Sequence, residues 1–201
     1  MKIAIAVLFL MLLSCTTDNS TRNTFSLPPE TQTGANTFGV TINGIVYIPR
    51  NPTGVSVGNS AKAVYFWGVT GGMWNEIEVV DGASDTGFNI IIHLQDLQNI
   101  GASQYILKQS NFQKRIYSTP QNHIYFKIWD AKTLNYAYYG SVENEGVVNV
   151  FKYEGSLTQD WILSGNFSGK FVRYGNPEDV IYITDGRFDL NLNTLYDQYY
   201  P

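Results

Sequence analysis

Hydrophobic and polar positions divide the chain into three stretches of different character. Residues 3–13 are apolar without interruption, whereas residues 16–36 are rich in Thr, Ser, Asn and Pro and show no hydrophobic period. From Thr37 onward, short runs of apolar residues alternate with turns that contain Gly or Asn, a pattern typical of β-strands. No stretch has a convincing helical period, although residues 96–100 could form a single turn. The pattern therefore predicts an all-β domain that begins near residue 37.

Turn signals within this domain predict about 9 to 11 strands. Asn43-Gly44 lies between two alternating runs and predicts a hairpin, because a type I′ turn needs two residues with positive φ. Gly71-Gly72 predicts a second hairpin between 62–70 and 73–80. Further strands are expected at 87–94, 104–108, 115–118, 123–130, 136–139, 147–153, 161–174 and 180–192, with a bulge or tight turn at Asp185-Gly186. In the strand 87–94, alternation puts Phe88, Ile90, Ile92 and Leu94 on one face, which we expect to point inward. We expect a single antiparallel β-sandwich or barrel-like domain.

The only cysteine, Cys15, directly follows the apolar run. Lys2 supplies a positive charge before that run, and Ser14 is the small residue expected at a cleavage site. Leu12-Leu13-Ser14-Cys15 resembles a bacterial lipobox, which implies cleavage before Cys15 and lipidation, for example with palmitate. A helix that spans a bilayer needs about 20 apolar residues, so this run is too short to do so. The alternatives are a buried N-terminal helix and a plain secretory signal, which usually ends in an Ala-x-Ala-type site.

These features predict a signal peptide over 1–14, a lipidated cysteine with a flexible tether over 15–36, and a β domain over 37–201. A flexible coil of about 20 residues spans roughly 25 Å r.m.s., which would hold the domain just off the membrane. We expect a location in the cell envelope, at the outer membrane. The sequence leaves the membrane face open, because Asp18 is the only acidic residue close behind Cys15.

Charge and composition exclude some classes of partner and cofactor. The formal net charge is −4, and Lys114-Arg115 is the only adjacent basic pair, so we expect no nucleic-acid partner. Lipidation of the only cysteine would leave no intrachain disulfide, so the β core must hold the domain together. Two distant histidines, His93 and His123, without a free thiol predict no metal site and no cofactor.

Several short motifs resemble one family. The residues concerned are Leu27-Pro28-Pro29-Glu30-Thr31-Gln32-Thr33-Gly34-Ala35-Asn36-Thr37-Phe38-Gly39, Asn43-Gly44, Ile162-Leu163-Ser164-Gly165-Asn166-Phe167 and Ile183-Thr184-Asp185-Gly186-Arg187-Phe188-Asp189. Together they resemble a family of uncharacterised bacterial lipoproteins that carry LPPxTxxGxNTFG after the lipid tether, an Asn-Gly hairpin and a closing GRFD strand. Members often have a cysteine just after Phe-Gly, where this chain has Val40. The resemblance implies an envelope lipoprotein and offers no catalytic residues.

Two acidic motifs are candidates for chemistry. Glu76 and Glu78 lie on one face of a predicted strand, roughly 7 Å apart between Cα atoms, which is reminiscent of the paired carboxylates of glycosidases. Alternating glutamates on the solvent face of a strand give the same pattern and are far commoner. The loop 81–87 faintly resembles a calcium loop, but it lacks an oxygen ligand at its third position and Glu at its twelfth. We expect a plain hairpin loop there.

Clustered tyrosines are the candidates for ligand binding. Tyr136, Tyr138 and Tyr139 follow a predicted turn, and a second cluster (Tyr196, Tyr199 and Tyr200) lies at the C-terminus. Flat aromatic faces can stack on sugar rings or anchor a protein partner. They also pair across strands and seal sheet edges, which is the commoner role.

The sequence therefore favours a non-enzymatic binding or scaffolding module, held at a membrane by the lipid on Cys15, with a protein or glycan partner. No residue is assigned a catalytic role. One alternative is a lipocalin-like carrier of an apolar ligand. The other is a glycan-acting enzyme that uses Glu76 and Glu78.

We expect Cys15→Ala to abolish partitioning of the expressed protein into the detergent phase, because the substitution removes the thiol that would carry the lipid. The measurement is detergent phase separation of the full-length protein. Ser14→Ala, which keeps a small residue before the cleavage site, is the matched control and should still partition. Unchanged partitioning of the Cys15→Ala protein would refute the lipobox.

Overall fold

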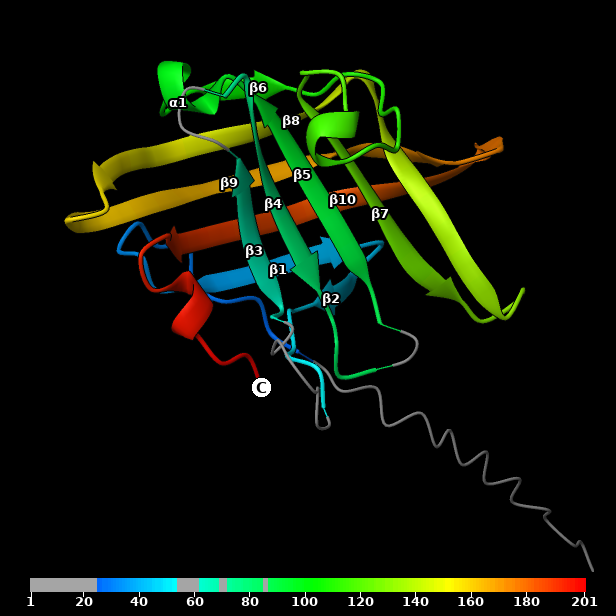
Figure 1. Ribbon diagram of the computed structural model, residues 1–201. Coiled ribbons are helices and arrows are strands. Elements are labelled where there is room, and N and C mark those ends of the chain that lie inside the picture. Colours follow the sequence, from blue (N-terminus) through cyan, green and yellow to red (C-terminus); the bar gives the residue numbers. More distant parts are fainter. Residues whose placement is uncertain (1–24, 54–61, 69–71, 85–86) are drawn as a thin grey trace, which may run out of the picture.

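A computed structural model describes residues 25–53, 62–68, 72–84 and 87–201, most of which lie in β-strands (Figure 1). The strands are β1 (Thr37–Ile42), β2 (Ile45–Tyr47), β3 (Val64–Gly68), β4 (Trp74–Val80), β5 (Asn89–Gln95), β6 (Gln104–Ile106), β7 (His123–Asp130), β8 (Asn135–Ser156), β9 (Gln159–Arg173) and β10 (Asn176–Asn191). Short helical turns are α1 (Leu97–Ile100), η1 (Arg115–Tyr117) and η2 (Leu195–Asp197). The strands form one antiparallel sheet of 10 strands in the order β2-β1-β10-β9-β8-β7-β5-β4-β3, with β6 paired to β8. The predicted all-β fold is confirmed.

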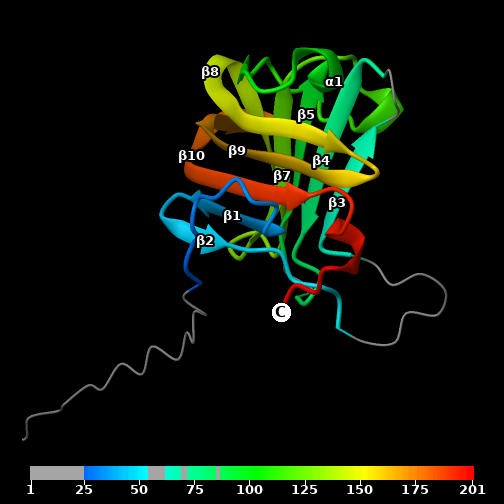
Figure 2. The ribbon, with the colours of Figure 1, turned by 90° about the vertical axis from the view of Figure 1, so that its left-hand side faces the viewer.

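The sheet folds over itself into two layers. Strands β3, β4, β5 and β7 make one layer, and β1, β2, β9 and β10 make the other, crossing it steeply (Figures 1 and 2). Strand β8 belongs to both, because residues 135–140 pair with β7 and residues 147–149 with β6, while β9 pairs with residues from both halves of β8. Within the described ranges β2 and β3 do not pair with each other, so the sheet is not closed into a barrel. In the same ranges no helix has the length and apolar character needed to span a membrane.

The strand β8 changes layers at a local break in its ladder. Its register with β9 shifts between Ser141 and Gly146, and Asn144 between them has a φ of 61°. Asparagine tolerates this left-handed conformation better than most residues. The sequence predicted two separate strands, 136–139 and 147–153, with a solvated turn around Asn144. The structure corrects this to one bent strand of 22 residues.

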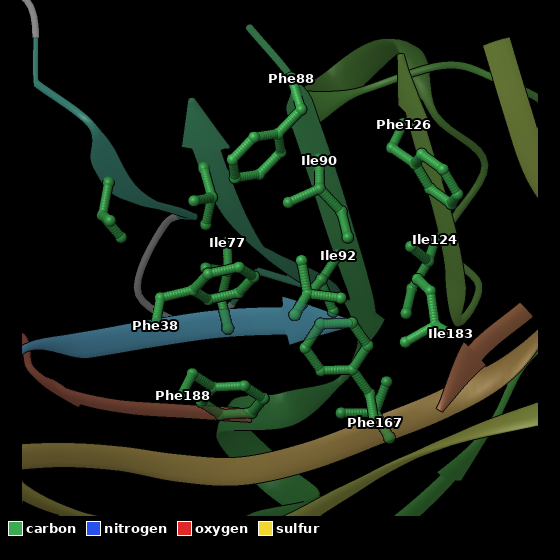
Figure 3. Close-up of a cluster of buried hydrophobic side chains, with 14 of the residues drawn as sticks. Phe38, Ile77, Phe88, Ile90, Ile92, Ile124, Phe126, Phe167, Ile183 and Phe188 are labelled. Atoms are coloured by element: carbon green, nitrogen blue, oxygen red, sulfur yellow. The ribbon is translucent and has the colours of Figure 1, made fainter. Parts of the chain in front are cut away.

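Aromatic and branched aliphatic side chains fill the space between the layers (Figure 3). Their strands contribute alternate residues, so β5 buries Ile90 and Ile92 against rings from the other layer, among them Phe167 and Phe188. Fully burying one such side chain contributes about 1.5–3 kcal/mol, which makes this cluster the main source of stability. The predicted inward face of β5 is confirmed.

Of four further predictions from the sequence, three agree with the structure and one is wrong. The Asn43-Gly44 hairpin is confirmed, with φ values of 46° and 80°. Strands β3 and β4 pair as expected, although residues 69–71 at their turn lie outside the described residues. The predicted bulge at Asp185-Gly186 is confirmed by a register shift between Ile183 and Gly186. The predicted strand 115–118 is wrong, because Arg115 is bound to Glu76 and Glu78 and begins the 3₁₀ turn η1 there.

The N-terminal segment 25–36 is bound to the domain through Asp189 of β10. The Asp189 carboxylate is 1% exposed and accepts hydrogen bonds from Thr31 Oγ1 at 2.6 Å and from the Gly34 N–H at 2.8 Å. The backbone N–H groups of Thr33 and Ala35 donate to it at 3.0 and 3.2 Å. Burial raises the pKa of Asp189, but these hydrogen bonds outweigh burial and leave the pKa below its usual value.

The predicted tether therefore needs a correction at its C-terminal end. Its described residues, from 25 to 36, belong to the domain, because their polar groups satisfy a buried carboxylate. The signal peptide, Cys15 and the rest of the tether lie outside the described residues.

The motifs that carry the family resemblance meet in space. Arg187 donates to the Pro28 carbonyl at 3.1 Å. Besides Asp189, Arg187 is thus a second residue of β10 that binds the N-terminal motif at 27–39. Phe167 lies opposite Gly186, and a Cβ on Gly186 would come within 2.3 Å of the Phe167 ring. Phe188 lies opposite Gly165 in the same way, with 2.8 Å between its ring and a Cβ at that glycine. Each glycine leaves room for the ring from the neighbouring strand.

We expect Asp189→Asn to lower the free energy of unfolding by roughly 2 to 3 kcal/mol, because an amide cannot replace a carboxylate that accepts from several N–H and O–H donors. Urea denaturation measures the effect. The matched control is Asp185→Asn in the same strand, since the Asp185 side chain is 56% exposed. That control should change stability by less than about 0.5 kcal/mol. Equal effects of the two substitutions would contradict the role of Asp189.

Candidate functional site

A row of polar side chains crosses the outer face of β4, β5 and β7. Glu76, His93 and His123 are directly opposite one another on these neighbouring strands. All three are fully buried, because the segment between β6 and β7, residues 107–122, lies over them; we name it the covering loop. The sequence described the two histidines as distant, whereas the fold brings them opposite each other, and the sequence did not reveal that a loop buries them.

His123 is held by two serines of the covering loop. Ser110 Oγ lies 3.0 Å from its Nδ1 and Ser118 Oγ lies 2.9 Å from its Nε2. A neutral imidazole has one donor and one acceptor nitrogen, and hydroxyl groups satisfy both. Burial, with a further contribution from His93, lowers the pKa of His123 to about 3. His123 is therefore neutral and serves to fasten the loop.

His93 has one satisfied nitrogen and one without a partner. Its Nδ1 lies 2.9 Å from the carbonyl oxygen of Gln121, so Nδ1 must carry the proton. Its Nε2 is then an acceptor, and it is buried with no hydrogen-bond partner among the described residues. Burial lowers the pKa of His93, which keeps the ring neutral.

Glu76 lies opposite His93 and also has one buried atom without a partner among the described residues. Its Oε2 accepts from the Arg115 backbone N–H at 2.8 Å, while its Oε1 is buried without a described partner. Burial, aided by the nearby charge of Glu78, raises the pKa of Glu76 from 4.5 to about 7. A neutral carboxyl group is less costly to bury than a carboxylate. Glu76 therefore holds its proton up to near-neutral pH.

Glu78 is charged and holds the covering loop by ion pairs. Lys114 Nζ lies 2.9 Å from its Oε1, and Arg115 Nη2 lies 3.2 Å from its Oε2. Trp67 Nε1 donates to it at 2.9 Å, and the Arg115 guanidinium lies 3.9 Å from the centre of the Trp67 ring. Burial raises the pKa of Glu78, but Lys114, Trp67 and Arg115 outweigh burial and hold it below the usual value.

The expected solvent-exposed face for Glu76 and Glu78 is therefore wrong. The two carboxylates do share one face of β4, but Glu76 is 0% and Glu78 is 6% exposed. The signal that sequence reasoning missed is Lys114-Arg115, whose charges reach back to β4 from the covering loop. The pair acts here as the fastening point of that loop.

Beside the covering loop, aromatic side chains surround an open hollow of about 450 Å³. Four rings line it, from Phe112 of the loop, Tyr125 of β7, Tyr138 of β8 and Tyr174 after β9, together with Asn111. We call it the aromatic hollow.

Packing positions the rings of the aromatic hollow. Phe112 lies over Gly140, where a Cβ would come within 2.6 Å of its ring. The Phe112 and Tyr174 rings meet edge to face at 5.1 Å between centroids. Tyr125 stacks on His123 at 6.0 Å, which connects the hollow to the buried polar row. The polar row therefore supports the wall of the hollow.

The three tyrosines predicted as ligand-binding residues fall in different places. Tyr138 lines the aromatic hollow and is 46% exposed. Tyr136 lies near it on the same face, against Trp129 and beneath Lys127. Tyr139 points the other way, into the core, because successive residues of a strand face opposite sides.

The C-terminal tyrosines behave mainly as structural residues. Tyr196 donates its hydroxyl to the Phe66 carbonyl at 2.8 Å, so it covers the edge strand β3. Tyr200 is buried and Tyr199 is exposed. The sequence missed Phe112, Tyr125 and Tyr174 as members of the hollow, since they are separated along the chain and only the fold gathers them.

The loop 81–87 does not resemble a cation site in the structure. The Asp81 carboxylate binds Arg50 at 2.8 and 2.6 Å and also accepts from the Ala83 N–H. Residues 85–86 lie outside the described residues. Among the residues that the structure describes, no three His, Cys, Asp or Glu side chains are grouped so that they could hold a metal ion.

Comparisons with protein-family models, with curated proteins and with solved structures found no match to this chain. The resemblance to bacterial lipoproteins therefore stays a prediction that rests on the motif residues. The interpretation of the aromatic hollow depends on its own geometry and chemistry.

The buried polar row predicts an unusual pH dependence. Because folding raises the pKa of Glu76 from 4.5 to about 7, its contribution to stability is complete below about pH 4.5 and is lost as the pH rises through 7. Glutamine at this position cannot ionise. We expect the free energy of unfolding of Glu76→Gln, relative to wild type, to shift in the variant's favour by about 3 kcal/mol between about pH 4 and pH 8. Urea denaturation across this pH range measures it.

Glu78→Gln is the matched control, with the opposite sign. Because folding lowers the pKa of Glu78, its contribution is present above the unfolded pKa and is lost as the pH falls. The Glu78→Gln protein should therefore lose more stability at pH 8 than at pH 4. Parallel curves for wild type and Glu76→Gln would contradict the protonated state of Glu76.

Proposed function

We propose that this chain is a lipid-anchored binding protein of the bacterial cell envelope, and that the aromatic hollow is its binding site. The observation that carries the proposal is the convergence of four aromatic rings, from segments far apart in the sequence, on one open hollow of about 450 Å³. Small-molecule sites commonly have volumes of about 300–1,000 Å³ and are lined by aromatic side chains with a few polar groups.

Exposure of the rings supports a binding role. Tyr174 is 72% exposed and Tyr138 is 46% exposed, although large aromatic side chains gain most from burial. The hollow is firmly built, because Phe112 is fixed over Gly140 by a loop that is itself held by ion pairs. A preformed site loses little conformational freedom when a ligand binds.

Binding is favoured over catalysis by what lines the hollow. Its lining residues include no carboxyl or imidazole group. The groups that could transfer protons, including Glu76 and Glu78, are buried beneath the covering loop. This arrangement supports a non-enzymatic role over that of a glycan-acting enzyme.

Binding at the surface is also favoured over carriage of an apolar ligand within the domain. The space between the two layers is filled by aromatic and aliphatic side chains (Figure 3). Among them, the rings of Phe126 and Phe171 lie 5.2 Å apart. The lipobox-like motif supports the membrane anchor, and the family resemblance supports a location in the cell envelope. Asp189 would then connect the anchored end of the chain to the domain.

We expect ring-bearing small molecules to bind in the aromatic hollow. The test is an NMR screen of the domain from residue 25 to 201 with three sets of probes, which are neutral sugars, aromatic amides and short fatty acids. Probes that bind should shift resonances of Tyr138 and Tyr174 and should lose binding in Tyr138→Ala. The matched control is Tyr182→Ala, which removes a tyrosine that is 53% exposed on β10. Binding by no probe, or binding that survives Tyr138→Ala, would overturn the proposal.

A further inference from the structure

The lining of the aromatic hollow specifies the kind of ring that it would hold. We propose that the hollow binds an uncharged pyranose, such as a neutral hexose or N-acetylhexosamine unit of a glycan. This inference rests on the proposed function, because it names the ligand class of the same site.

The first argument is charge. None of the residues that line the hollow is charged. Of the nearby basic residues, Arg173 binds Asp130 at 3.3 Å and Asp179 at 3.2 Å. Lys127, directly opposite Tyr138, has its Nζ 4.4 Å from the centre of the Tyr136 ring. An anionic ligand would lose hydration against a lining that itself offers no charged partner.

The second argument is the shape of the lining. The Phe112 and Tyr174 rings stand at 73° to each other, so the hollow presents two aromatic faces that meet at an angle. A pyranose has one face made of C–H groups, which can lie against an aromatic ring with gain from burial and dispersion. Tyr138 and Tyr174 are exposed enough to offer such a face.

The third argument is the polar rim. The hydroxyl-bearing side chains of Tyr125, Tyr138 and Tyr174 line the hollow, and Asn111 beside them supplies an amide whose Oδ1 accepts from the Gln113 N–H at 3.0 Å. Hydroxyls and an amide can both donate and accept, as the hydroxyl edge of a sugar requires. An acyl chain would cover these groups without pairing them, which costs free energy. The lining thus fits a ligand that is apolar on its faces and polar at its edge.

Isothermal titration calorimetry against neutral hexoses, N-acetylglucosamine and their short oligomers tests the inference. We expect binding that increases with oligomer length, and a loss of about tenfold or more in affinity for Tyr138→Ala and for Tyr174→Ala. Tyr138→Phe, which keeps the ring and removes the hydroxyl, should weaken sugar binding less than Tyr138→Ala. Tyr182→Ala should bind as wild type. Thermal unfolding of each variant confirms that it is folded.

Four other experimental outcomes would each overturn a specific part of the proposals. Aromatic amides that bind in the hollow, with no binding by sugars, would overturn this inference and leave the proposed function standing. Tighter binding of uronic acids or sialic acid than of neutral sugars would overturn the assignment of an uncharged ligand. Equal affinity of wild type, Tyr138→Ala and Tyr174→Ala would overturn the placement. Absence of binding by any probe would overturn both proposals.

Discussion

The bend in β8 is the constraint on which the rest of the structure depends. A single antiparallel sheet has two faces, and an apolar face is stable only when it is covered. Here the sheet covers its own inner face, because β8 changes layers between Ser141 and Gly146. The rings of Phe126, Phe167 and Phe188 then meet between the layers. The long strand thus replaces the second sheet that a sandwich would otherwise need.

The same bend leaves an outer face on β4, β5 and β7 that needs a different cover. That cover is a polar loop, and it is held by charge and hydrogen bonds to Glu76, Glu78 and the two histidines. Burying such groups is costly unless they are paired, so the position of the loop is closely specified. Because Phe112 belongs to this loop, the buried polar row also determines the shape of the aromatic hollow.

The elements that the sequence predicted correctly are those specified by residues close together in the chain. The Asn43-Gly44 hairpin depends on the φ preferences of two adjacent residues, and the inward face of β5 depends on alternation within one strand. The interpretation of 115–118 failed because ion pairs to Glu78, 36 and 37 residues away along the chain, decide the conformation there. Tyr138 was recognised as a candidate from its cluster, whereas Phe112, Tyr125 and Tyr174 stand in separate segments with no shared pattern.

The sequence alone determined the strand-rich, antiparallel character of the domain, since periodicity and turn residues act over a few positions. The sequence also contains the motifs at 27–39 and 183–189, but it does not show that they contact each other in the fold. Only the tertiary structure showed that Asp189 accepts hydrogen bonds from residues 31–35 and that Glu76 and His93 are buried opposite each other. The reason is physical: burial, and hydrogen bonds between residues more than 150 positions apart, depend on how the sheet folds over itself. The conformational preferences of neighbouring residues do not specify how the sheet folds.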